Sequence, residues 1–330
     1  KSVFGITQRA LKNGTLGFSL PALMPKYFVL LSTFAILWGA NSQSDAQPYN
    51  APQDNSIKAS VSVIGFNQLN TNLNTGGSFG WAWASASVSL IKPVSSATTV
   101  GASVRYDSQF WNWSNMESYD NGGKSPWSTI NTPALSLIYS HKLDSDWKLN
   151  LVPTLESAAE QGANLNDSLT YGTILSASKQ LSPTLNLGLG TGIFRQIDAY
   201  RIFPYLVIDW KISDRWNLNN PFPGGPTGGA GLELTYSATT NFKVSGGAAY
   251  RSYRFRLNNS GPYAGGVGQN RFIPVFAKFS YAFDRTTILD LYTIANVGGS
   301  ISATNVNGNT ALSTNYKTAP AVALNLIKRF

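Results

Sequence analysis

The sequence contains no cysteine and a single histidine, His141. Without cysteine, the chain forms no disulfide, binds no metal through thiolates and has no lipoprotein anchor. One histidine does not make a zinc site, and a histidine-dependent hydrolase needs its base beside a serine or a carboxylate. His141 follows Tyr139 near a predicted short turn, on an apolar face, where we expect an interfacial role. The sequence therefore predicts no catalytic, cofactor-binding or metal-binding residues, no cofactor and no enzymatic activity.

Charged residues are also scarce. They make up 12% of the chain, against roughly a quarter in ordinary globular proteins. The net charge is nevertheless +9. Because the sequence has no run of Lys and Arg and no basic-aromatic module, that charge does not indicate nucleic-acid binding. Low charge, abundant Ser, Thr, Asn and Gly, and 12% aromatics are typical of a sheet with lipid on one side and uncharged polar groups on the other.

Long apolar runs are absent too. A helix that spans a membrane needs about 18 or more apolar residues, whereas the run Tyr27–Ala40 has 14. Preceded by Met24-Pro-Lys26 and followed by the small residues Ser44 and Ala46, it has the form of a secretory signal. We predict that residues 1–46 are an upstream segment plus signal peptide, with the start at Met24 and cleavage after Ala46, and that 47–330 form the mature domain. The alternative is that Tyr27–Ala40 is a buried core helix.

From Ser56 onward, apolar and polar residues alternate with period 2, which indicates strands with one apolar face. Short turns rich in Asp, Ser, Pro and Thr alternate with long connections rich in Gly and Asn. This order is typical of an up-and-down antiparallel barrel with short turns at one end and long loops at the other. Fourteen strands are predicted: 56–66, 80–91, 98–110, 132–143, 147–156, 171–181, 185–196, 202–212, 215–219, 230–236, 242–255, 272–283, 287–301 and 316–330. Twelve is the alternative, because three prolines cut the segment 215–219 short.

The last of these segments ends in an aromatic residue, Phe330. An alternating strand with an aromatic residue at its C-terminus looks like the closing strand of a bacterial outer-membrane β-barrel, where this end also serves the assembly machinery. An edge strand of a soluble β-sandwich would alternate in the same way. Two patterns favour the membrane: the polar faces carry Ser, Asn and Gly more than Lys and Glu, and aromatics gather at strand ends, as in interfacial girdles. The localisation predicted is the outer membrane of a Gram-negative bacterium.

Four stretches in the C-terminal part carry a resemblance to a known family: 229–236, 248–257, 274–281 and 289–292. They resemble a family of uncharacterised bacterial outer-membrane β-barrel proteins, a domain of unknown function, mainly over residues 200–330. The resemblance implies the fold and the location. It implies no substrate and no catalytic residue.

Charged residues on the predicted polar faces are candidates for the barrel lumen, where rings of charge tune ion preference. Cross-lumen ion pairs of purely structural value are the alternative. The candidates are Lys58, Arg105, Asp107, Lys148, Glu156, Asp209, Lys211, Glu233, Lys243, Arg251, Lys278 and Asp290.

These observations leave three functional hypotheses. The first is a porin-like channel for small polar solutes, because about eight strands fill with side chains and 16 to 18 leave open water. The second is a surface-binding or structural barrel, in which removal of the connection 111–131, with its three tryptophans, abolishes binding and leaves folding intact. The third, an outer-membrane hydrolase, is the weakest because the predicted loops lack histidine. If the barrel spans lipid, Leu206→Arg impairs assembly whereas Val207→Arg is tolerated.

Overall fold

The computed structural model describes residues 56–119, 122–143 and 146–330. The predicted signal segment, its start and its cleavage site lie outside the described residues. In the described part the regular secondary structure is all β-strand, apart from one 3₁₀ turn at Asn166–Ser168. No helix there has the length and apolar character needed to cross a bilayer.

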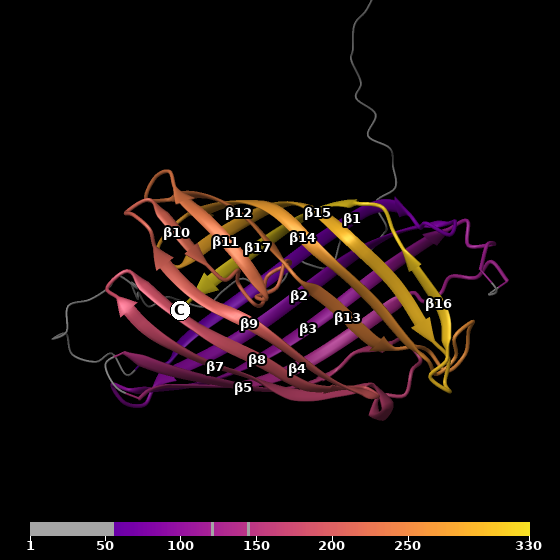
Figure 1. The fold of residues 1–330 in the computed structure, drawn as a ribbon, viewed down its shortest axis with the longest axis horizontal. Coiled ribbons are helices and arrows are strands. Elements are labelled where there is room, and N and C mark those ends of the chain that lie inside the picture. The colour runs from indigo at the N-terminus through magenta and orange to yellow at the C-terminus, as the bar shows by residue number, and fades with distance from the viewer. Residues whose placement is uncertain (1–55, 120–121, 144–145) are drawn as a thin grey trace, which may run out of the picture. The chain divides into compact units, whose positions relative to one another are not determined.

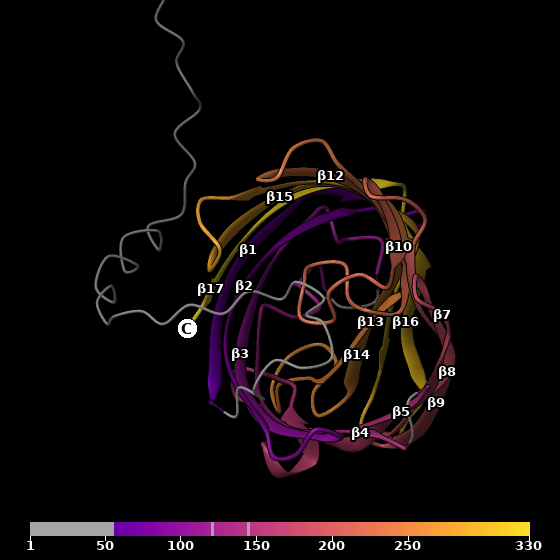
Figure 2. The same cartoon turned by 90° about the vertical axis from the view of Figure 1, so that its left-hand side faces the viewer.

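Fourteen antiparallel strands close into one barrel (Figures 1 and 2). The last strand pairs with the first, with Leu326 opposite Val63. The number and the order of the strands confirm the sequence prediction. The wall consists of β1 (Lys58–Asn72), β2 (Ser78–Pro93), β3 (Thr98–Ser114), β4 (Thr129–Lys142), β5 (Trp147–Ser157), β7 (Leu169–Ser182), β8 (Leu185–Gln196), β9 (Ala199–Lys211), β10 (Trp216–Asn219), β11 (Gly231–Ser237), β12 (Phe242–Ala249), β14 (Val267–Ala282), β15 (Thr287–Thr304) and β17 (Ala319–Arg329).

Three further segments lie at the long-loop end. β13 (Arg251–Arg256) continues β12 after a break at Tyr250, and β16 (Thr310–Asn315) precedes β17; both pair with wall strands. The third, β6 (Ala159–Glu160), pairs with β4 on one side and with β13 on the other. β13 and β16 lie toward the right in Figure 1, and the short turns lie toward the left.

The outward-facing side chains form an apolar belt around the barrel. Val104, Leu137 and Leu189 are 59%, 54% and 71% exposed. Exposed aromatics that include Phe110, Tyr171 and Tyr200 lie toward the long-loop ends of their strands, and others that include Tyr139, Trp147, Trp210 and Tyr281 lie toward the short-turn ends. A continuous exposed apolar surface with aromatics at both borders is the outer face of a membrane-spanning barrel. In the closing strand, Val322, Leu324 and Leu326 face outward.

The barrel narrows at the long-loop end. β6 joins β4 directly to β13, and a bridge between Leu73 and Tyr316 links the ends of β1 and β16. The ring at that level therefore runs through nine segments (β1 to β4, β6 and β13 to β16) and bypasses β5 and β7 to β12. A barrel of about eight strands has an interior that side chains fill. Here the filling is aromatic, and we call it the aromatic plug: Phe66, Phe79, Trp81, Trp83, Trp111, Trp113, Trp127, Phe255, Phe272 and Tyr316.

Stacked and edge-on contacts link the two sides of this plug. Trp81 stacks on Trp111 with ring centroids 5.2 Å apart, and its edge meets Tyr253 of β13 at 5.5 Å. Trp127 meets Phe255 at 5.2 Å. These rings come from β2, β3, the following connection and the opposite wall. The plug therefore closes the direct path along the barrel axis at the long-loop end.

Candidate functional site

Four of the predicted lumen charges lie together just below the aromatic plug. Arg105 places Nε 3.0 Å from Asp107 Oδ2 and Nη2 3.2 Å from Glu156 Oε2, so that one guanidinium forms ion pairs with two carboxylates. Arg251 donates two hydrogen bonds to the Tyr253 hydroxyl and lies over the rings of Trp83 and Tyr253. β3, β5 and β13 therefore bring these groups together from widely separated parts of the chain.

These residues border a cavity of about 160 Å³, which we call the sub-plug cavity. Asp107 is 7% exposed, and its Oδ1 has no hydrogen-bond partner. The cavity thus offers guanidinium donors, a free carboxylate oxygen and aromatic faces, which suits a small polar solute. Its lining is Arg105, Asp107, Gln109, Ile130, Thr132, Glu156, Ala158, Gln196 and Arg251–Phe255.

A second group of predicted lumen charges is locked in side-chain pairs. Lys278 forms an ion pair with the buried carboxylate of Glu233. Asp290 accepts a hydrogen bond of 3.3 Å from Asn325, whose Oδ1 accepts one from Ser62. This group joins strands on either side of the barrel closure, and its compact pairing favours a structural role over a selectivity ring.

The other five candidates do not join either group. Lys58, Lys148, Asp209, Lys211 and Lys243 are exposed and lie close to the short-turn end. Lys211 pairs at 2.8 Å with Asp214 in the adjacent turn, and this hydrogen bond and charge hold the pKa of the Asp214 carboxyl below its ordinary value. The structure therefore separates the predicted set into a cavity group, a paired group and a rim group.

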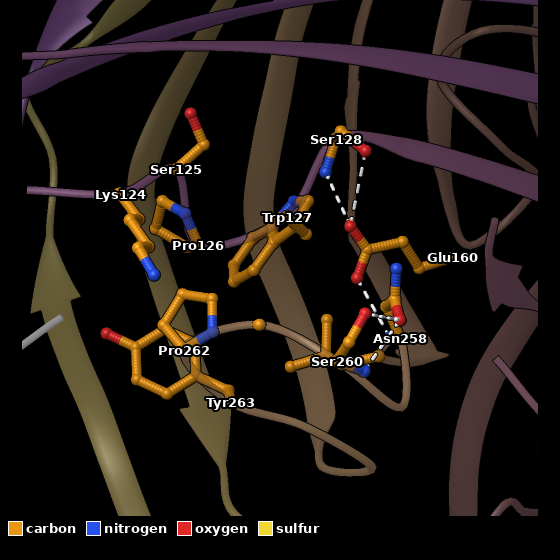
Figure 3. Close-up of a pocket in the computed structure, with 12 residues that line it drawn as sticks. Lys124, Ser125, Pro126, Trp127, Ser128, Glu160, Asn258, Ser260, Pro262 and Tyr263 are labelled. Carbon is orange, nitrogen blue, oxygen red and sulfur yellow. Dashed lines mark hydrogen bonds between the residues drawn. The ribbon is translucent and has the colours of Figure 1, made fainter. Parts of the chain in front are cut away.

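A pocket of about 200 Å³ lies among the long loops themselves (Figure 3). Pro126 and Trp127 face Pro262 and Tyr263 across it. Behind them, the Glu160 carboxylate accepts hydrogen bonds from the backbone N–H groups of Ser128 and Asn258, both at 2.9 Å. Burial raises the pKa of Glu160, and these hydrogen bonds oppose the shift. Glu160 thereby holds two long loops against β6.

The predicted strand 98–110 ends too early, and this argues against the prediction that the connection 111–131 can be removed with folding intact. Trp111 and Trp113 belong to β3, which extends to Ser114, and Trp127 is 1% exposed in the aromatic plug. Inward-facing aromatics beyond Gln109 continue the period-2 pattern of the strand. The residues from Trp111 to Ser114 were therefore assigned to a loop although they continue β3. Removal of this segment would remove a large part of the barrel interior.

Sequence reasoning missed several residues that shape the cavity. Arg254 forms an ion pair with Asp198 in the turn between β8 and β9, and Tyr253 lies between Arg251 and the plug. The alternating run Arg251-Ser-Tyr-Arg-Phe-Arg256 carried a signal for them, because one face of it is aromatic and the other is polar. The sequence pattern gave no indication of their contacts across the barrel, such as the pairing of Arg254 with Asp198. His141, by contrast, lies where it was expected, with Nδ1 2.8 Å from the Thr98 hydroxyl near the short-turn end.

Comparison with known proteins adds a family resemblance. A family model described as "Domain of unknown function (DUF6268)" matches residues 101–264, a little under half of the chain. The expected resemblance to an uncharacterised family is thus confirmed, over a stretch that shares residues 200–264 with the expected one. No curated protein matches the sequence.

Solved structures with some similarity are outer-membrane proteins. The COG4313 outer-membrane channel from Pseudomonas putida F1 has 9% identity and a TM-score of 0.48, over 87% of this chain and 100% of that one. The TodX monoaromatic hydrocarbon channel has 10% identity and 0.43, over 85% and 91%. The KdgM porin in complex with oligogalacturonate has 10% and 0.34, over 82% and 99%. The barrel assignment for this chain rests on its own hydrogen-bond ladders.

Proposed function

We propose that this chain is an outer-membrane channel for small polar solutes and is not an enzyme. The observation that carries the proposal is the inner face of the fourteen-strand barrel, which offers Ser, Thr, Asn and paired charges from the short turns up to the sub-plug cavity. Fourteen strands enclose more space than side chains alone fill, since filling is complete at about eight strands. The β10–β11 connection takes up part of that space, with Gly225 beside Tyr292 and Gly228 beside Arg251.

Reconstitution into planar bilayers tests the proposal. The folded barrel should give discrete conductance steps in potassium chloride and should let small sugars swell proteoliposomes. The matched control is the same protein after heat unfolding, which loses its compact migration on gels together with its conductance. Correctly folded barrels that insert but give neither conductance nor swelling would refute the channel.

The pocket in Figure 3 supports a second candidate, recognition of an external ligand by the long loops. Its mouth is lined by the half-buried Pro262 and by the exposed Lys124, Ser125 and Ser260, where a sugar or peptide could bind. Pro262→Ala should then weaken binding to whole cells or purified barrels without altering heat-modifiable migration. The same substitution should leave conductance unchanged, which separates this role from transport.

A further inference from the structure

The barrel wall is incomplete on one side. β10 has four residues, and its ladder with β9 ends at the pair Asn219–Asp209. β9 continues for ten more residues, from 208 back to Ala199, with a partner only on its β8 side. Figure 1 looks onto this side, where β9 and β13 lie apart and strands β2 and β3 of the far wall are seen between them.

Side chains terminate the ladder where the backbone stops. Asn220 accepts a hydrogen bond from the Ile208 N–H at 3.0 Å and donates to the carbonyls of Leu206 and Gly231 at 2.8 and 2.9 Å. One amide thus replaces the next rung between β9 and β11. The backbone N–H and C=O groups of the even-numbered residues of β9 point toward this edge, as the contacts of Leu206 and Ile208 with Asn220 show. Among these residues, Pro204 has no N–H to leave unpaired. The hydrogen-bond ladder on this side of β9 therefore ends at Asn220.

The sub-plug cavity reaches this opening. Arg251, Tyr253 and Phe255 lie on the inner face of β13, where they contact the plug, whereas Ser252 and Arg254 lie on its opposite face. All five line the same cavity. A cavity can border both faces of one strand only if it extends around the edge of that strand. In β13, this edge is the one opposite the β8–β9 turn.

The outer surface around this edge is polar. Ser252 and Arg254 neighbour Gln269 and Arg271 of β14, and the apolar surface begins one step lower, at Ile273. Across the gap, the aromatic border of the belt includes Tyr200, at the start of β9. Irregular backbone is not tolerated against lipid tails and needs water or protein beside it. The part of the opening between β13 and the β8–β9 turn therefore lies at the outer border of the membrane, where headgroups and water meet the wall.

We propose that small polar solutes pass between the lumen and the exterior through a side portal between β13 and the β8–β9 turn, beneath the aromatic plug. The proposal rests on the proposed channel function and names its route. The Arg254–Asp198 ion pair spans the portal, so that rearrangement of these two side chains opens and closes it.

The charges around the portal indicate the class of solute. Three guanidinium groups (Arg105, Arg251, Arg254) meet three carboxylates (Asp107, Glu156, Asp198). Because the signs balance, the portal favours neutral or zwitterionic polar solutes and discriminates weakly between small cations and anions. In a potassium chloride gradient, the reversal potential should lie near zero. Asp107→Asn should shift it toward anion preference.

The absence of cysteine allows a direct test by single-cysteine variants. Ser252→Cys places a thiol at the portal, and Asn307→Cys places one in the exposed connection above the plug. Each folded variant is reconstituted, and its conductance is recorded before and after attachment of a maleimide that carries a polyethylene glycol chain. We expect the adduct at 252 to abolish most of the conductance and the adduct at 307 to change it little. Asp198→Ala should raise the conductance of the unlabelled protein.

The outcomes separate the portal from the channel. If the unlabelled variants conduct and the adduct at 252 blocks no more than the adduct at 307, the portal is overturned and the channel stands. If folded wild-type barrels do not conduct at all, the channel function fails, and the portal fails with it. If the adduct at 252 blocks selectively, both hold.

Discussion

Substitution of arginine at two adjacent positions of β9 tests the membrane-spanning orientation. Leu206 faces outward and is 40% exposed, and Val207 faces the lumen opposite Gly188. Leu206 lies six residues from Tyr200 and four from Trp210, the aromatic borders of the belt on this strand. It is therefore close to the middle of the apolar zone, where no headgroup is within easy reach of a guanidinium.

Leu206→Arg should cost about 2–4 kcal/mol of folding free energy, the range for arginine on the lipid face near the bilayer midplane. Val207→Arg should cost much less, because the new side chain enters a polar lumen beside a glycine that offers no competing side chain. Leu206→Ala is the matched control for lost apolar contact without a charge. The measurement is urea unfolding in lipid vesicles, followed by the heat-modifiable mobility of the barrel.

Equal destabilisation by Leu206→Arg and Val207→Arg would refute the orientation. A larger effect of Val207→Arg would reverse it and place the apolar face in a protein core. Recovery of the wild-type protein from the soluble fraction would contradict the membrane assignment altogether. Repetition with Val104→Arg and Ser103→Arg on β3 checks that the result does not depend on the neighbouring gap in the wall.

Three further predictions concern the interior and one turn. Trp81→Ala should destabilise the barrel by about 3–5 kcal/mol, as for other buried tryptophans, and should raise conductance if the remaining rings no longer fill the narrow ring; unchanged stability and conductance would contradict the plug. Lys278→Met should cost about 3–5 kcal/mol because it leaves Glu233 buried without its partner, whereas Lys278→Met combined with Glu233→Leu should recover most of that loss; a double variant as unstable as the single one would argue against the pairing. In the last short turn, hydrogen bonds from Thr286 and Thr287 hold the pKa of Asp284 well below its ordinary value. The stability that Asp284 contributes should be complete above the unfolded-state pKa of about 4 and should be lost as the pH falls through the lower folded-state value. Asp284→Ala should therefore weaken this turn at neutral pH and remove its acid dependence, measured by hydrogen exchange of the Thr286 and Thr287 amides.

The sequence alone determined the wall of this protein. Period-2 alternation depends only on the geometry of a single strand, so each strand could be predicted from its own residues. The alternation of short turns with long loops then predicted the order of the strands. Even the weakest strand, predicted at 215–219 and observed at Trp216–Asn219, was marked by the prolines that follow it. The outward direction of Leu206 and Leu324 follows from the same local rule.

Only the tertiary structure decided what the wall encloses. The contacts of Arg105 with Glu156, of Trp81 with Tyr253 and of Arg254 with Asp198 join residues from different hairpins, and no local pattern encodes which strands face each other across a closed barrel. The two-residue strand β6 is too short to carry a periodic signal, yet its pairing with both β4 and β13 narrows one end. Strand periodicity therefore fixed which face each side chain occupies, and the shear and closure of the barrel fixed its partner on the opposite side.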